Sequence, residues 1–179
     1  MIIRHAEKHN GGREHGVNLD GFRTKHELTV RGWQRAGALA GFFAPPGGLP
    51  DGAPISTPRS ILASAATKLS PSLRAQHTVM PLAELLGVEI DKRHADGEEA
   101  AAAAAALAAP GPVLIAWHHS HIPKLARLIG GDAPGVPHTW HEDCFDVVWV
   151  LDRDDGPAAP WRFSQVVQRL FANDRAHPL

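Results

Sequence analysis

The chain has 179 residues, of which 44% are hydrophobic and 21% charged, and its formal net charge is -1. These values are ordinary for a globular protein, and we expect a single domain over residues 1–179. The small net charge excludes a broad basic field that would attract nucleic acid, and a lone cysteine, Cys144, excludes an internal disulfide. No apolar run approaches the length of a membrane-spanning helix, so we expect no membrane partner.

The chain begins with an apolar segment, residues 1–4, that reads as a short buried strand ending at Arg4 and His5. A polar, glycine-bearing loop is expected over residues 9–27. Apolar residues then recur at helical spacing, which predicts a helix that Thr29 caps and that ends before Pro45.

Residues 44–58 are rich in proline and glycine and predict a second loop, and residues 60–64 are a candidate strand. A further helix should follow, with Ser70 at its N-cap and Pro71 in its first turn, and Gly87 should end it. Pro81 lies inside this helix and predicts a kink or a break.

The second half of the chain repeats the alternation of helix and strand. An alanine-rich stretch over residues 97–110 is strongly helical, and residues 112–117 form a continuous apolar run of the kind found in a central strand. The segment from His118 leads into another helix. Residues 145–151 and 161–167 are two further candidate strands.

This alternation predicts an α/β fold, a three-layer α/β/α sandwich with a largely parallel central sheet. In such sheets the active site lies beyond the carboxyl ends of the strands. Arg4 and His5 follow one strand, and His118 and His119 follow another. We therefore expect these two pairs to face the same crevice.

The start of the chain offers no basic and apolar leader before its first motif, so the expected location is the cytoplasm. A leader lost from a trimmed or misassigned start would change that location. The oligomeric state is left open by the sequence.

Three blocks together resemble the histidine phosphatase (phosphoglycerate mutase-like) superfamily, and in particular its small bacterial members. They are RHAEK at residues 4–8, SxRAxxT at residues 72–78, and a histidine that ends a strand before a helix. The resemblance extends over nearly the whole chain, including LTVRGWQRAGALA at residues 28–40. It implies a phosphoglycerate mutase-like fold and phosphatase chemistry.

The resemblance also implies roles for individual residues. His5 matches the nucleophile of the family, Arg4 its partner in the Arg-His pair, and Arg74 the arginine of the second block. His119 matches the second histidine, because related chains carry Trp-Glu-His at this point, and His118 then replaces the glutamate. His121 is the alternative for the same role.

The general acid has no clear match in the sequence. Glu7, close to His5, is the first candidate, and Glu89 and Asp91 are the alternatives in the segment where many relatives carry a glutamate. Related first blocks usually read RHG, whereas Ala6 stands here in place of the glycine.

The residue types suit phosphoryl transfer. A neutral imidazole can attack an anionic phosphate ester without charge repulsion, and two arginines can hold the phosphoryl oxygens with forked donors. The cations are supplied by side chains, so we expect no metal and no cofactor. The alternative, a metal site built from His118, His119, His121, His138 and His141, lacks the cysteine or carboxylate spacing of a known pattern.

The sequence thus predicts a metal-independent histidine phosphatase, a phosphoric monoester hydrolase, that acts on a phosphate monoester or phosphoanhydride through a phosphohistidine on His5. The substrate would be a phosphorylated small molecule or a phosphopeptide. A catalytically weak phosphate-binding regulatory protein on the same fold and a phosphomutase are the alternatives. The loops at residues 9–27, 44–58 and 132–144 are the expected walls of the specificity pocket.

Overall fold

The computed structural model describes residues 1–11, 14–154, 156 and 159–178, so residues 12 and 13 of the first expected loop lie outside the described residues. Strands and helices alternate through most of the chain. The strands are β1 (Ile2–Arg4), β2 (Ser60–Ala63), β3 (Ile90–Asp91), β4 (Val113–Trp117), β5 (Val147–Asp152) and β6 (Arg162–Val167). The helices are α1 (Val30–Phe43), α2 (Arg74–Leu86), α3 (Glu99–Ala108) and α4 (Ile122–Gly130).

The strands form one mixed sheet in the order β3-β2-β4-β1-β5-β6. The pairs β2–β3, β2–β4 and β1–β4 are parallel, whereas β5 runs antiparallel to both β1 and β6. The sheet is therefore mostly parallel, as the sequence predicted. The two-residue β3 was not expected, because its sequence carries no apolar run of strand length.

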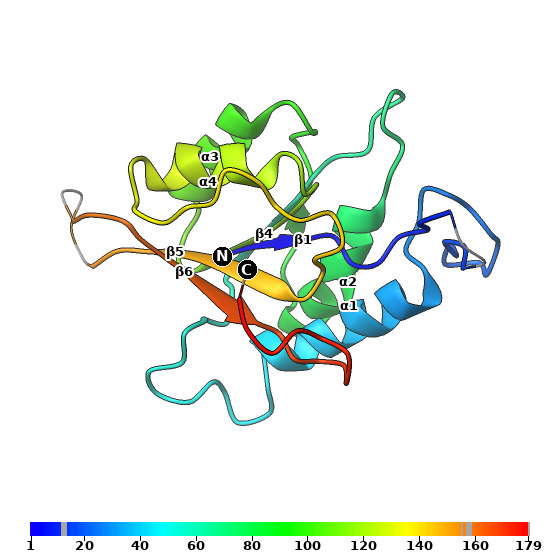
Figure 1. Ribbon diagram of the computed structural model, residues 1–179, viewed down its shortest axis with the longest axis horizontal. Coiled ribbons are helices and arrows are strands. Elements are labelled where there is room, and N and C mark those ends of the chain that lie inside the picture. The colour runs from blue at the N-terminus through cyan, green and yellow to red at the C-terminus, as the bar shows by residue number, and fades with distance from the viewer. Residues whose placement is uncertain (12–13, 155, 157–158, 179) are drawn as a thin grey trace.

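Helices cover both faces of the sheet, which confirms the three-layer architecture (Figure 1). On one face α1 and α2 pack on residues that include Ile3, Ile61 and Leu114. On the other face α3 and α4 pack on residues that include Ile115 and Trp149. Successive strand residues point to opposite faces, so a strand buried on both sides needs the continuous apolar runs seen in β1 and β4. None of the described helices combines the length and the apolar character that crossing a membrane would require.

The ends of α1 and α2 test the helix caps that the sequence predicted. The hydroxyl of Thr29 accepts a hydrogen bond from the Gly32 N–H at 3.2 Å, so it caps α1 as expected. Gly87 ends α2 in the left-handed conformation, with φ of 64°. Ser70, however, is not an N-cap, and α2 begins at Arg74.

The late start of α2 follows from contacts made by the preceding residues. The Ser70 N–H donates to the Thr67 hydroxyl at 3.0 Å and the Leu73 N–H donates to the His26 carbonyl at 3.2 Å. These bonds hold the segment in a turn against the first loop. The helix runs through Pro81 without interruption.

Candidate active site

The carboxyl ends of three neighbouring strands bring the expected residues together. His5 follows β1 and its N–H donates to the Trp117 carbonyl at 3.1 Å, which continues the pairing with β4. On the other side of β4, the Ser64 N–H donates to the Ala116 carbonyl at 3.2 Å. Arg4, His5, Ser64 and His118 therefore leave the sheet at the same edge, where the active site of an α/β fold lies.

His5 is held in one tautomer by the backbone. Its Nδ1 lies 2.7 Å from the Ala6 carbonyl oxygen, which can only accept, so Nδ1 carries the hydrogen. Nε2 is then an unprotonated nitrogen, and it is buried without a hydrogen-bond partner. Burial and the nearby charge of Arg4 lower the pKa of His5 well below its usual value. The imidazole is thus neutral and its lone pair is available.

Two arginines lie beside His5 with unused donors. Arg4 is 1% exposed, stacks on the Phe145 ring at 3.8 Å and donates through Nη1 to the Glu142 carbonyl. Its Nε and Nη2 are buried without partners, as is Nε of Arg74. Burial lowers the pKa of Arg4 to about 10 and also lowers that of Arg74. An oxyanion bound here would supply the acceptors that these guanidinium donors lack.

The second sequence block fixes α2 against the end of β1. The Thr78 hydroxyl accepts a hydrogen bond from the Ala6 N–H at 2.8 Å and donates to the Arg74 carbonyl at 2.7 Å. Arg74 in turn donates through Nη2 to the Lys25 carbonyl at 2.6 Å. The spacing SxRAxxT thus places the arginine at the pocket and, one helical turn later, the threonine against the backbone of Ala6, next to His5.

The three histidines after β4 do not alternate across an extended strand. The strand ends at Trp117, and the Ile122 N–H donates to the His118 carbonyl at 3.2 Å, which closes a turn. The ring of His118 lies 5.9 Å from that of His5 and 4.4 Å from that of His119, between centroids. The side chains of His118 and His119 therefore lie next to each other, and the ring of His118 lies beside that of His5.

Burial lowers the pKa of both His118 and His119 to about 4, helped by neighbouring histidines and by Arg4. Both imidazoles are therefore neutral near pH 7. Nδ1 of His119 is buried without a partner. Within the described residues, no group of three or more histidine, cysteine, aspartate or glutamate side chains has an arrangement that could hold a metal ion.

Glu7 lies close to His5 in sequence, but its carboxylate faces α1. It accepts from Arg35 at 2.8 and 3.0 Å and from Arg31 at 3.2 Å. Arg35 is 2% exposed and also binds Asp174 at 2.8 Å, which ties the C-terminal segment to α1. Gly32 permits this approach, because a Cβ there would meet the Glu7 carbonyl oxygen at 2.5 Å.

This network predicts a large loss of stability when Arg35 is removed. Arg35→Met leaves the buried carboxylates of Glu7 and Asp174 with Arg31, a partly exposed side chain at 3.2 and 3.9 Å, in place of their buried cation, at an expected cost of about 3–5 kcal/mol. Urea denaturation of the purified variant measures it. Arg31→Met is the matched control, because the Arg31 side chain is 34% exposed, and should cost less than about 1 kcal/mol. Equal losses for the two variants would contradict the assignment of Arg35 as the centre of the network.

The other two acid candidates lie away from the pocket. Glu89 is exposed, and Asp91 in β3 is ion-paired with Arg93 at 2.6 Å. The carboxyl group that does line the pocket is that of Asp96, which sequence reasoning missed. Its Oδ1 is buried without a partner, and burial raises its pKa. In the sequence, its position after β3 and just before α3 could have indicated that Asp96 lies near the pocket.

The pocket that contains His5 has a volume of about 460 Å³. Its walls come mainly from the segment that follows β2 and from the first turn of α2, within residues 64–75, together with Asp96, His118 and His121. His26 is the contribution of the first expected loop. The expected wall at residues 44–58 lies elsewhere.

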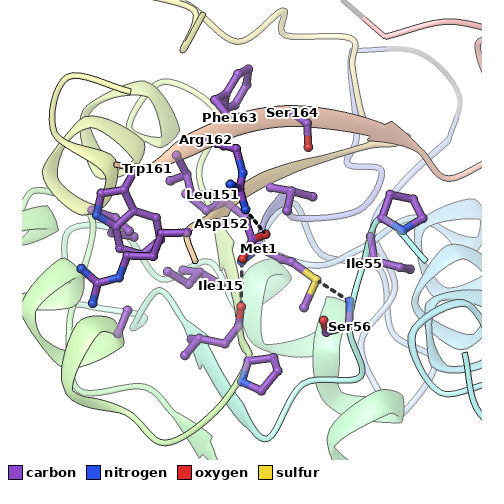
Figure 2. Close-up of a pocket in the computed structure, with 18 of the residues that line it drawn as sticks. Met1, Ile55, Ser56, Ile115, Leu151, Asp152, Trp161, Arg162, Phe163 and Ser164 are labelled. Carbon is purple, nitrogen blue, oxygen red and sulfur yellow. Dashed lines mark hydrogen bonds and ion pairs between the residues drawn. The ribbon is translucent and has the colours of Figure 1, made fainter. Parts of the chain in front are cut away.

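A larger cavity, of about 770 Å³, opens at the opposite end of the sheet (Figure 2). Met1, Asp152 and Arg162 face it, with Ile55 and Ser56 of the loop at residues 44–58. It contains none of the residues of the three sequence blocks. Among the residues that line it, Arg162 is ion-paired with Asp152, and both side chains lie at the surface.

No protein-family model matches the chain, and no curated protein matches it by sequence. Solved structures do match its fold. The structure of the protein histidine phosphatase SixA complexed with tungstate has 18% sequence identity and a TM-score of 0.53, over 93% of this chain and 95% of that one. The native structure of a mycobacterial glucosyl-3-phosphoglycerate phosphatase has 14% identity and a TM-score of 0.52, over 91% and 95%.

Both structures are phosphatases by their names, and both are matched over nearly their full length. The match covers the mostly parallel sheet and the helices on its two faces, and it agrees with the fold that the three sequence blocks imply. The chain therefore shares its fold, a phosphoglycerate mutase-like α/β fold, with these two solved phosphatases.

Proposed function

We propose that this protein is a metal-independent phosphatase that hydrolyses a phosphate monoester through a phosphohistidine on His5. The observation that carries the proposal is the state of His5: Nδ1 is fixed on the Ala6 carbonyl, and Nε2 is unprotonated beside unpartnered donors of Arg4 and Arg74. The similarity to solved phosphatases supports the same reaction class.

In the first step, Nε2 of His5 attacks phosphorus and the bond to the leaving oxygen breaks. Arg4 and Arg74 hold the phosphoryl oxygens, and a neutral histidine adds a further hydrogen bond as charge develops on them. The leaving alkoxide needs a proton. Asp96 is the carboxyl group in the pocket that can donate it, whereas the Glu7 carboxylate is occupied by Arg31 and Arg35.

In the second step, water attacks the phosphohistidine. Asp96, now ionised, accepts a proton from the water, the phosphorus–nitrogen bond breaks and inorganic phosphate leaves. His5 and protonated Asp96 are thereby restored.

The proposed function is tested by a phosphatase assay with an aryl phosphate in the presence of EDTA and of tungstate. EDTA should leave the rate unchanged, because guanidinium groups supply the positive charge. Tungstate should inhibit competitively by occupying the Arg4 and Arg74 donors. Loss of activity on chelation, restored by zinc or magnesium, would instead favour a metal site in the histidine cluster. Absence of turnover together with phosphate binding would favour the regulatory protein.

His118 and His119 are the two candidates for the second histidine, which donates a hydrogen bond to the phosphoryl group. The family resemblance assigns this role to His119, whereas the contact with His5 favours His118. Loss of a donor to the phosphoryl group should lower kcat by about 10²–10³ with little change in KM. Steady-state kinetics of His118→Gln and His119→Gln decide the matter, and the variant with the larger fall in kcat identifies the donor. Equal wild-type kinetics for both would remove the second histidine from the mechanism.

A further inference from the structure

A buried carboxylate outside the proposed chemistry holds one of the pocket histidines. Glu99, the first residue of α3, has a fully buried side chain. It accepts from Nδ1 of His121 at 2.8 Å, from Nζ of Lys124 at 2.9 Å and from the Gly97 N–H at 2.6 Å. His121, at the start of α4, lines the pocket of His5.

The contact with Glu99 determines which nitrogen of His121 faces a ligand. Hydrogen bonds from Lys124 and from the Gly97 N–H both favour the ionised form of Glu99, and a carboxylate is only an acceptor, so Nδ1 of His121 carries a hydrogen. Nε2 is the remaining nitrogen. The side chain of His121 is 35% exposed, which leaves this nitrogen accessible from the pocket. Glu99 is thus placed as a positioning residue for His121.

The pocket wall around His121 is polar, with few charged groups. Ser64, Ser70, Ser72 and His26 offer hydroxyl and imidazole groups. Among the described residues that line this pocket, Arg74 is the one arginine or lysine, and it is already committed to the phosphoryl group. Lys8 acts on His118 and His119 from outside this lining. A second anionic group beside His121 would meet Asp96, whereas hydroxyl groups would find partners. The volume of about 460 Å³ suits a small molecule.

We infer that His121, positioned by Glu99, hydrogen-bonds a hydroxyl group of the leaving alcohol, so that the substrates are phosphate monoesters of neutral, hydroxylated alcohols such as sugars or polyols. This inference rests on the proposed phosphatase function and assigns its substrate class. It separates such substrates from unsubstituted alkyl phosphates, which lack the hydroxyl groups. It also separates them from phosphorylated acids, which carry a second anion.

Three substrates of equal chain length test the inference: glycerol 1-phosphate, propyl phosphate and 3-phosphoglycerate. For the wild type, kcat/KM should be highest for glycerol 1-phosphate. His121→Phe should lower kcat/KM for glycerol 1-phosphate about tenfold, the usual worth of one hydrogen bond, and change that for propyl phosphate less than about twofold. His138→Gln, in an exposed loop, is the control for loss of a histidine elsewhere.

The positioning role of Glu99 has its own readout. Glu99→Gln replaces an acceptor by an amide that can donate or accept, so it no longer determines which ring nitrogen is protonated. Imidazole ¹⁵N shifts of His121 should show hydrogen on Nδ1 in the wild type and in Lys124→Gln, and a mixture of tautomers in Glu99→Gln. Glu99→Gln should also reduce the preference for glycerol 1-phosphate, whereas Lys124→Gln should keep it.

The outcomes separate this inference from the function on which it rests. A wild type that hydrolyses none of the three substrates and no aryl phosphate would overturn both. Turnover with equal losses for glycerol 1-phosphate and propyl phosphate in His121→Phe would overturn the substrate class alone, as would a wild-type preference for 3-phosphoglycerate. An unchanged tautomer in Glu99→Gln would overturn the positioning role.

Discussion

His5→Ala should abolish phosphatase activity while the protein stays folded, because the proposed role of this imidazole is covalent. Removal of the nucleophile in enzymes with a covalent intermediate costs on the order of 10⁶ in kcat. The variant also loses the Nδ1 contact to the Ala6 carbonyl, but the strand pairing through the His5 backbone N–H remains. Initial rates with an aryl phosphate, together with circular dichroism and thermal unfolding, measure the two properties separately.

The covalent intermediate can be tested directly. Wild-type protein quenched during turnover of labelled substrate should carry phosphate that is released by acid and retained in base, as a phosphoramidate is. His5→Ala should carry none, and His141→Ala, a variant of an exposed histidine, should be labelled like the wild type. Label that is stable to acid, as on serine, would contradict the mechanism even if His5→Ala were inactive.

The parts of the site that could be predicted from sequence are those fixed by strand ends and by a helix's first turn. β1 ends at Arg4 because its apolar residues end there, and parallel pairing with β4 then determines which edge His5 reaches. Arg74 follows from the spacing to Thr78, since one helical turn links the pocket to the Ala6 N–H. Apolar runs and periodicity carry this information locally.

The choice between His118 and His119 could not be made locally. It depended on whether β4 stays extended beyond Trp117, and the hydrogen bonds that close the following turn decide that. The position of Glu7 was equally inaccessible. Glu7 stands close to His5 in sequence, but its partner Arg35 lies 28 residues away, and Arg35 in turn binds Asp174, which is 139 residues further along the chain. Such long-range ion pairs leave no pattern in a single sequence.

Asp96 was missed for a related reason. The sequence near it offers several carboxylates, and Glu89 and Asp91 lay closer to the expected place of the acid. Their spacing does not reveal which carboxyl group is buried. Asp91 is satisfied by Arg93, whereas Asp96 keeps an unpartnered buried oxygen in the pocket of His5. Burial and pairing, which only the fold determines, distinguish a structural carboxylate from a candidate proton donor.

Asp96→Asn should lower kcat for alkyl phosphates by about 10²–10⁴, the usual contribution of a general acid. The amide keeps the size of the side chain and can still contact Ser64, so the fold should be retained. Nitrophenyl phosphate should lose much less in its first step, because nitrophenolate leaves without a proton. In the second step the variant lacks a base, so phosphohistidine should accumulate, and a burst of nitrophenol in a stopped-flow experiment measures that accumulation.

The pH dependence of kcat/KM gives an independent test of the acid's identity, because the direction of each pKa shift predicts which limb of the profile a group controls. Burial lowers the pKa of His5 well below its usual value and that of His118 to about 4, so both rings are neutral near pH 7 and their protonation reduces the rate only in acid. Burial raises the pKa of Asp96, as does the charge of Glu99, while His121 opposes the rise. The proton donor is therefore present below that raised pKa and is lost as the pH rises through it, which gives the profile for alkyl phosphates an alkaline limb. Asp96→Asn should remove the alkaline limb, whereas Glu7→Gln should keep it. Retention of the full bell-shaped profile in Asp96→Asn, with equal losses for alkyl and nitrophenyl phosphates, would return the role of the acid to another group.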